Sequence, residues 1–199
     1  SNLGDNNNWS TSGFLLFRQK LGKPGRTISA NVRYSFSNNN LLGFNQSLTS
    51  VKGESGEWTD EIVNQRFDQN SRSLSLNGRV VYTEPLTKHL FLEANYSYGW
   101  SRNTSYKNTF NSGSDLLNDG LLIFDPAGES LDDRYSNNIL NRSITQRAGL
   151  NFSYQKEKFR AQLGASINPT DTYNETTGHD AYRSKVINWS PQAMLNYEF

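Results

Sequence analysis

The sequence predicts an all-β fold, an antiparallel up-and-down meander of about seven or eight long strands that forms a curved sheet. Three observations support this prediction: runs in which apolar and polar residues alternate, connections that alternate between short and long, and aromatic residues at both ends of the runs. Alternation with a period of two residues gives a strand one apolar and one polar face. Gly, Ser, Thr and aromatic residues dominate these runs, and that composition disfavours helices.

The clearest alternation is TISANVRYSF, residues 27–36, where every second residue is apolar. Five later runs repeat it with few exceptions, such as Val81 and Gln146. In an earlier run, 13–21, residues 14–17 are all apolar, so its register is not determined. The predicted strands lie near residues 13–21, 27–37, 71–83, 90–102, 143–155, 159–168 and 185–199. Residues 1–12 show no period, and we expect a disordered or artificially added start there, followed by a partial barrel over 13–199.

The connections between these strands alternate in length. Short turns are predicted at residues 21–26, 84–89 and 156–158, and long polar segments at 37–71, 103–143 and 168–185. Successive connections of a meander fall on opposite ends of the sheet, so all short turns would share one end. Outer-membrane barrels have this asymmetry, with short periplasmic turns and long extracellular loops. The pattern therefore predicts a fragment of a large transmembrane β-barrel.

Aromatic residues mark both ends of the predicted apolar face. At the long-loop ends they are Tyr34, Phe36, Tyr96, Tyr98, Trp100 and Trp189, and at the short-turn ends Tyr82, Tyr154, Phe159, Tyr197 and Phe199. Two aromatic girdles around an aliphatic band are typical of barrels at the lipid headgroups. We therefore expect Ile28, Ala30 and Val32 to face lipid. Seven strands do not close such a barrel, so the chain reads as part of a larger one.

Composition excludes several other classes. A net charge of +1 without a basic stripe argues against nucleic-acid binding. The absence of cysteine excludes disulfides, thiolate catalysis and zinc fingers. No apolar run approaches the roughly 20 residues of a membrane-spanning helix. The mean hydropathy of −0.75 does not oppose a barrel, because each strand averages its lipid and lumen faces.

Several motifs resemble a known family. They are the KPGRT turn, NQR before a strand, YTEPL, LEANYSY and RAGLNFSY, spread over most of residues 13–199. Together they resemble the outer-membrane β-barrel region of TonB-dependent-receptor-like proteins of the Bacteroidetes. The resemblance implies a location in the bacterial outer membrane and a complete protein several times longer, with a plug domain and about 22 strands. It also implies nutrient import driven by a TonB-type energy-coupling protein that acts on a plug absent from this chain.

The sequence contains few residues that could form a catalytic, phosphate-binding or metal site. His89 and His179 lack partners at ligand spacing, and no phosphate loop or nucleophile elbow occurs. Calcium has oxygen ligands available in the acidic segment 114–133, at Asp115, Asp119, Asp125, Glu129, Asp132 and Asp133. Their spacing is not that of an EF-hand, and Asp119-Gly120 reads better as a hairpin turn. We therefore predict no catalytic residues, no metal site and no cofactor.

Five charged residues fall on the predicted polar faces, where a barrel has its lumen: Arg33, Arg79, Glu93, Arg147 and Arg160. The leading hypothesis is a non-enzymatic barrel fragment that contacts outer-membrane lipid and, through its loops, an unknown nutrient solute. The alternative is a soluble secreted β-sandwich that binds glycans through Trp58, Tyr106 or Tyr135. A membrane-embedded hydrolase is a third option, which the lack of a nucleophile and base disfavours.

Overall fold

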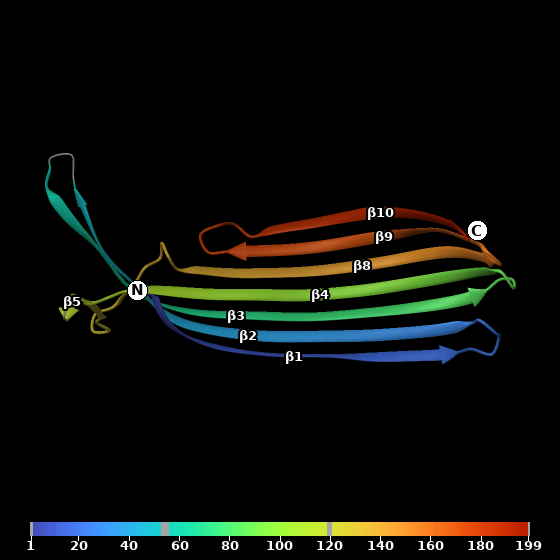
Figure 1. The fold of residues 1–199 in the computed structure, drawn as a ribbon, viewed down its shortest axis with the longest axis horizontal. Helices are drawn as coiled ribbons and strands as arrows, with labels where there is room; N and C mark the ends of the chain where they lie inside the picture. Colours follow the sequence, from blue (N-terminus) through green and yellow to red (C-terminus); the bar gives the residue numbers. More distant parts are fainter. Residues whose placement is uncertain (1, 53–55, 119–120, 199) are drawn as a thin grey trace.

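The computed structural model describes residues 2–52, 56–118 and 121–198. Its main feature is one open antiparallel sheet in which seven long strands follow one another in chain order (Figure 1). These strands are β1 (Asn2–Lys20), β2 (Thr27–Lys52), β3 (Trp58–Pro85), β4 (Leu90–Asn111), β8 (Asn137–Lys156), β9 (Phe159–Thr176) and β10 (Tyr182–Tyr197). The short β7 (Ser130–Leu131) pairs with β4, and β5 (Asp115–Asn118) pairs with β6 (Leu121–Phe124) as a separate hairpin. The predicted all-β meander is confirmed.

The connections are sorted between the two ends of the sheet as expected. The turns β1–β2, β3–β4 and β8–β9 all lie at the right end in Figure 1, and the other connections lie at the left end. The turn after β1 is closed by backbone hydrogen bonds from Leu21 to Arg26 and from Arg26 to Lys23. We call the two ends the short-turn end and the loop end.

The prediction that these long segments are loops was wrong. Most of the segments 37–71, 103–143 and 168–185 are strand, and the connections shrink to residues 53–57, 112–136 and 177–181. β2 and β3 contain 26 and 28 residues, whereas a tilted strand needs only about 9–11 to cross a bilayer. Alternation ends near Phe36 and Leu74, but backbone hydrogen bonds continue the ladder through Asn-rich and Ser-rich sequence.

The expected start was also wrong. Residues 2–12 belong to β1, which pairs with β2 from Asn2↔Asn45 to Lys20↔Thr27. This register also resolves the apolar run 14–17. Leu15 and Phe17 lie beside Val32 and Ala30, while Phe14 and Leu16 lie beside Arg33 and Asn31. Residues 4–12 are mostly polar, so this part of β1 lacks alternation although it continues the ladder with β2.

The register gathers the predicted apolar positions of all strands on one face. Directly paired residues project from the same side of an antiparallel sheet, and one such row is Ile28, Tyr82, Ala94, Leu150, Ala165 and Pro191. We call this side the apolar face and the other side the polar face. None of the described hydrophobic residues is buried, and many are exposed, among them Leu15 at 77% and Leu163 at 65%.

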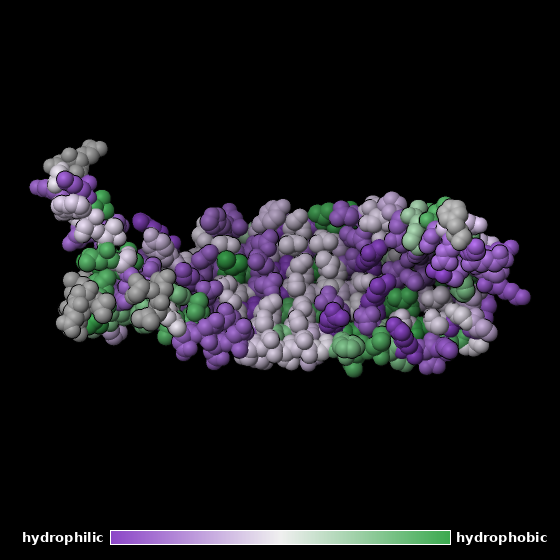
Figure 2. Space-filling view, viewed as in Figure 1, coloured by the Kyte–Doolittle hydropathy of each residue, from purple (hydrophilic) through white to green (hydrophobic). Residues whose placement is uncertain are grey.

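The two faces are not covered by any second layer of long strands. The only other sheet of the described residues is the four-residue pairing of β5 with β6, so the sandwich alternative is wrong. Figure 2 shows a face of mostly hydrophilic and neutral residues, with hydrophobic residues in patches along its upper and lower edges and at its left end. No helix among the described residues is long and apolar enough to cross a membrane.

Candidate functional site

The polar face carries all five charged residues that the sequence selected. Arg33 lies beside Asn77, Glu93 beside Asn151, and Arg160 beside Gln155. Arg79 and Arg147 share one row of the sheet and flank Ser97 of β4. The structure therefore brings Arg79 and Arg147 together across one strand and leaves the other three on separate rows.

Arg79 and Arg147 line a shallow hollow in the polar face. Its volume is about 450 Å³, and the other side chains that line it are largely polar, such as Asn31, Asn77 and Thr145. Both arginines are exposed, and no ion pair of the described residues includes them. This part of the wall therefore presents positive charge and amide groups to whatever lies in front of it.

A polar network crosses four strands nearer the short-turn end. Asn151 of β8 donates through Nδ2 to Glu93 of β4 at 3.4 Å, and its Oδ1 accepts from Nε2 of Gln192 on β10. The side chain reaches β10 by lying across Gly164 of β9, where a Cβ atom would overlap Asn151 Oδ1. Asn151 is buried although it is polar, so the sheet itself holds Glu93 in place through this amide.

Two more pairs of asparagine and glycine repeat this arrangement on the polar face. Asn77 lies over its partner Gly99, and Asn95 over its partner Gly149, with amide atoms about 3.0–3.2 Å from where a Cβ would stand. Glycine lets another group approach the backbone closely. The amides therefore lie flat on the sheet, and this part of the polar face has low relief.

A second hollow lies on the polar face at the loop end. It has a volume of about 530 Å³, and Leu41, Val63, Phe67 and Tyr135 supply apolar surface, while Lys107 supplies the charge. The Phe67 ring covers Gly43, and Lys107 Nζ stands 5.2 Å from the centre of that ring. We call this hollow the outer pocket. An aromatic and aliphatic wall beside one cation suits a solute with both an apolar part and a negative charge.

Thr109 of β4 fixes the segment that carries Tyr135. Its side chain is 3% exposed, its Oγ1 donates to the Tyr135 carbonyl at 2.9 Å, and its carbonyl accepts from Asp132 at 2.8 Å. Gln65 is also buried, and its Nε2 donates to Asp132 Oδ2 at 3.2 Å and to Asn111 Oδ1 at 2.9 Å. These hydrogen bonds hold the connection over the pocket.

The hairpin β5–β6 is anchored to the apolar side of the same region. Arg66 of β3 forms a bidentate ion pair with Glu129, with Nη2 to Oε1 at 2.8 Å. The same guanidinium lies 4.5 Å from the Phe110 ring centre and 5.9 Å from that of Phe124. Asn64 donates to the Ile123 carbonyl at 2.9 Å. The 112–136 connection is therefore bonded to side chains on both faces of β3.

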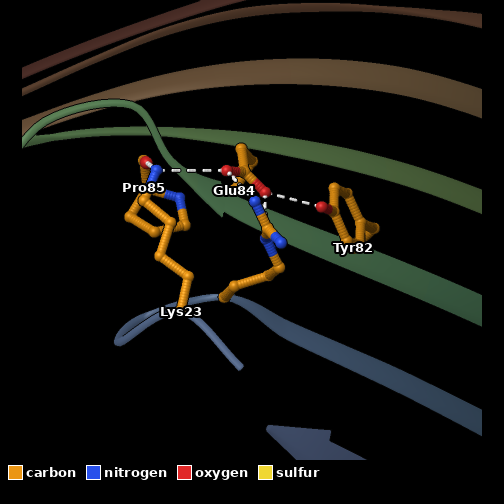
Figure 3. A network of polar contacts seen from close by, with 5 residues as sticks. Lys23, Tyr82, Glu84 and Pro85 are labelled. Atoms are coloured by element: carbon orange, nitrogen blue, oxygen red, sulfur yellow. Dashed lines mark hydrogen bonds and ion pairs between the residues drawn. The ribbon is translucent and has the colours of Figure 1, made fainter. Parts of the chain in front are cut away.

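A charged cluster ties two turns together at the short-turn end (Figure 3). Arg26, in the first turn, binds Glu84 of β3 through Nε at 2.7 Å and Nη2 at 2.8 Å, and Tyr82 donates to Glu84 at 2.6 Å. Lys23 adds contacts to Glu84 at 3.3 Å and to the Pro85 carbonyl. Hydrogen bonds from Arg26 first, and then from Tyr82, lower the pKa of Glu84 to about 2.

The described carboxylates of the acidic segment 114–133 do not gather around one point. Among the described residues no group of three or more His, Asp or Glu residues stands ready for a metal. Asp125 accepts from Ser114 and from the Ala127 N–H, which lowers its pKa, while Glu129 binds Arg66 and Asp132 binds Gln65. Asp119 and the predicted Asp119-Gly120 turn lie outside the described residues, although their neighbours Asn118 and Leu121 pair.

The remaining candidates stand apart. His89 and His179 are exposed and hydrogen-bonded to the carbonyls of Gln155 and Thr177. Of the three loop aromatics, Tyr135 lines the outer pocket, Tyr106 lines another hollow beside His179, and Trp58 lies under Lys52 on the β2–β3 hairpin. They do not form a shared platform.

Comparison with known proteins gives the context for this geometry. The family model of the outer membrane protein beta-barrel family matches residues 19–199. The chain belongs to that family. Its members are proteins of the bacterial outer membrane, and the open meander is a fragment of such a barrel.

Two solved structures are similar in fold. One is BauA, the ferric preacinetobactin receptor of Acinetobacter baumannii, with a TM-score of 0.53 and 10% identity over 96% of this chain and 28% of that one. The other is Fiu, the ferric-catecholate import receptor of E. coli K12, with a TM-score of 0.45 and 13% identity over 96% of this chain and 30% of that one. This chain thus spans less than a third of each receptor. A search of curated proteins finds no match.

The outer pocket and the glycine-covering amides were missed by sequence reasoning. A weak signal existed for the amides, because Asn77, Asn95 and Asn151 all fall on predicted polar faces. Their glycine partners lie on the next strand, so the pairs become visible only once the register is known. The sequence gives no signal for the outer pocket, because the pocket is built by segments that the sequence predicts to be loops.

Proposed function

We propose that this chain forms part of the wall of a receptor barrel that imports a nutrient solute, with its polar face toward the lumen and its apolar face toward lipid. The observation that supports this most is the apolar face, which seven strands share and no second layer of long strands covers in the described structure. In water such a surface favours association, whereas in a bilayer it is stable. Arg33, Arg79, Glu93, Arg147 and Arg160 then line the lumen.

The face assignment can be tested with two neighbouring residues of β3. Val80 lies on the apolar face and Arg79 on the polar face. Spin labels are attached at Val80→Cys and Arg79→Cys in a full-length protein without other cysteines, reconstituted in lipid. The relaxation of each label is then measured with oxygen and with a water-soluble nickel complex. Oxygen concentrates in the bilayer, so Val80→Cys should respond more to oxygen. The reverse pattern would overturn the assignment.

Within this function, the wall is non-enzymatic, and the energy for import comes from a TonB-type protein that acts on a plug outside this chain. The membership of the family and the receptor fold support this proposal. It is tested by deleting the gene and comparing growth on single nutrient sources with a complemented strain. Loss of growth on one source, restored by the gene but not by a form without its plug, supports import.

The outer pocket is the surface that we propose meets the solute. It lies at the loop end and combines Phe67, Tyr135 and Lys107. Phe67→Ala and Lys107→Gln in the full-length protein should each lower uptake several-fold at equal surface amount. Leu163→Ala on the apolar face is the matched control. Unchanged uptake in both pocket variants would remove the pocket from the import path.

A further inference from the structure

Cations follow the loop-end border of the apolar face. On four strands, the residue two positions beyond the end of the alternating apolar run on that face is Arg or Lys. These residues are Arg72 beyond Leu74, Arg102 beyond Trp100, Arg142 beyond Ile144 and Lys185 beyond Ile187. All four side chains are exposed. We call them the cationic belt.

The belt holds like charges side by side. Arg102 of β4 and Arg142 of β8 are direct partners in the register, and like charges directly opposite each other destabilise a sheet. No ion pair of the described residues includes Arg72, Arg102, Arg142 or Lys185. An anion between the two guanidinium groups would remove this repulsion.

The acids of the same border offset only part of the charge of the belt, through Asp171, the register partner of Lys185. Asp171 is held by Arg183 at 2.9 and 2.5 Å, and the charges of Lys185 and Arg142 also act on it. Glu175 accepts from Tyr173. Arg72 donates to the neutral amide of Asn38 at 3.1 Å, and Arg142 stands 5.5 Å from the Tyr173 ring centre. The border therefore carries more positive than negative charge.

The belt runs obliquely across the strands. A line at constant height in the membrane crosses the tilted strands of a barrel in the same way. Arg72 lies two residues farther out than Arg102, because its partner on β4 is Thr104, and Lys185 lies two residues farther in than Arg142, level with Ile144. Four residues along a strand cover about 13 Å and four strand spacings about 19 Å, which gives a slope of about 35°. Strands in barrels tilt by roughly 35–45°.

The belt is therefore at a constant height in the membrane, directly outside the aromatic girdle. We propose that it binds the phosphate groups of lipids in the outer leaflet, whose acyl chains lie on the apolar face below. Arginine pairs with phosphate through two parallel hydrogen bonds, and the girdle next to it supplies the interface for the chains. The proposal rests on the face assignment made above.

The direct test is lipid binding by the full-length protein in detergent, followed by native mass spectrometry. The probes are diphosphorylated lipid A, the same lipid without phosphates, and inorganic phosphate. We expect wild type to retain the phosphorylated lipid, and the variant R102Q/R142Q to retain about tenfold less, since two charge-assisted contacts are lost. R102K/R142K keeps the charges and should recover much of the binding.

The matched control is R79Q/R147Q, which removes the same two charges from the polar face and should bind as wild type. Equal binding by R102Q/R142Q and wild type would overturn the proposal, and so would equal retention of the dephosphorylated lipid. Displacement of the lipid by millimolar inorganic phosphate would assign the belt to free anions instead. Loss of binding in R79Q/R147Q alone would reverse the face assignment, which the spin labels measure independently.

Discussion

Residues 28–36 of β2 and residues 38–52 of the same strand have the same backbone pairing and different side chains. Both segments are in continuous register with β3, from Ile28↔Tyr82 to Lys52↔Trp58. The first segment alternates apolar and polar residues, whereas the second is rich in Asn and Ser. The ladder of backbone hydrogen bonds therefore defines the strand, while alternation reports only the surroundings of its two faces.

The largest effect should come from placing a charge on the apolar face within the first region. Val80→Arg in the full-length protein should cost about 2–4 kcal/mol, the cost of arginine near the middle of a bilayer. Val81→Arg is the matched control, because Val81 is the next residue of β3 and lies on the polar face. Urea unfolding in lipid vesicles measures both. Equal losses in the two variants would show that the faces do not differ.

The next effect concerns the amides that lie over glycine. Gly164→Ala places a Cβ 2.8 Å from the Leu150 carbonyl oxygen as well as against Asn151, and such overpacking costs about 1–3 kcal/mol. Gly78→Ala should be nearly neutral, since its nearest neighbour is 4.0 Å away. Unfolding midpoints in lipid vesicles compare them. A Gly164→Ala protein as stable as Gly78→Ala would contradict the close approach.

A smaller effect is expected outside the apolar band, where hydrogen bonds replace apolar contacts. Thr109→Val removes the donor to the Tyr135 carbonyl and should cost about 1 kcal/mol. Because only the 132–136 segment depends on this bond, amide hydrogen exchange should accelerate there and stay unchanged in β9. Acceleration throughout the sheet would mean that the segment is not an independent unit.

The smallest effect is a pH dependence at the short-turn end. The pKa of Glu84 is lowered to about 2 from an ordinary 4.5, so its contribution to stability is present above pH 4.5 and is lost as pH falls toward 2. Glu84→Gln should lower the unfolding temperature at pH 6 and flatten its change between pH 5 and 3. Glu61→Gln, whose carboxylate makes no ion pair in the described structure, should leave the profile unchanged.

The same contrast explains what the sequence could predict. Six strands, their apolar face and the sorting of the turns could be predicted from alternation and from residues such as Ile28 and Tyr82, because one apolar and one polar face impose a period of two. The outer halves of the strands could not, because Asn38 to Asn40 carry no periodic signal. Arg66 with Glu129 and Arg26 with Glu84 join residues 63 and 58 positions apart, and only the register brings them together.

The long strands contact chiefly their neighbours in the sheet, and the described hydrophobic residues have no buried centre. In water this exposed apolar face favours association with other molecules, because the described residues form no core that buries it. We expect the folding of this chain to draw on the transfer of the apolar face into lipid, together with partner strands for β1 and β10. On the proposed face assignment, assembly and membrane insertion of this region are then a single event, in which each strand provides the pairing edge for the one that follows.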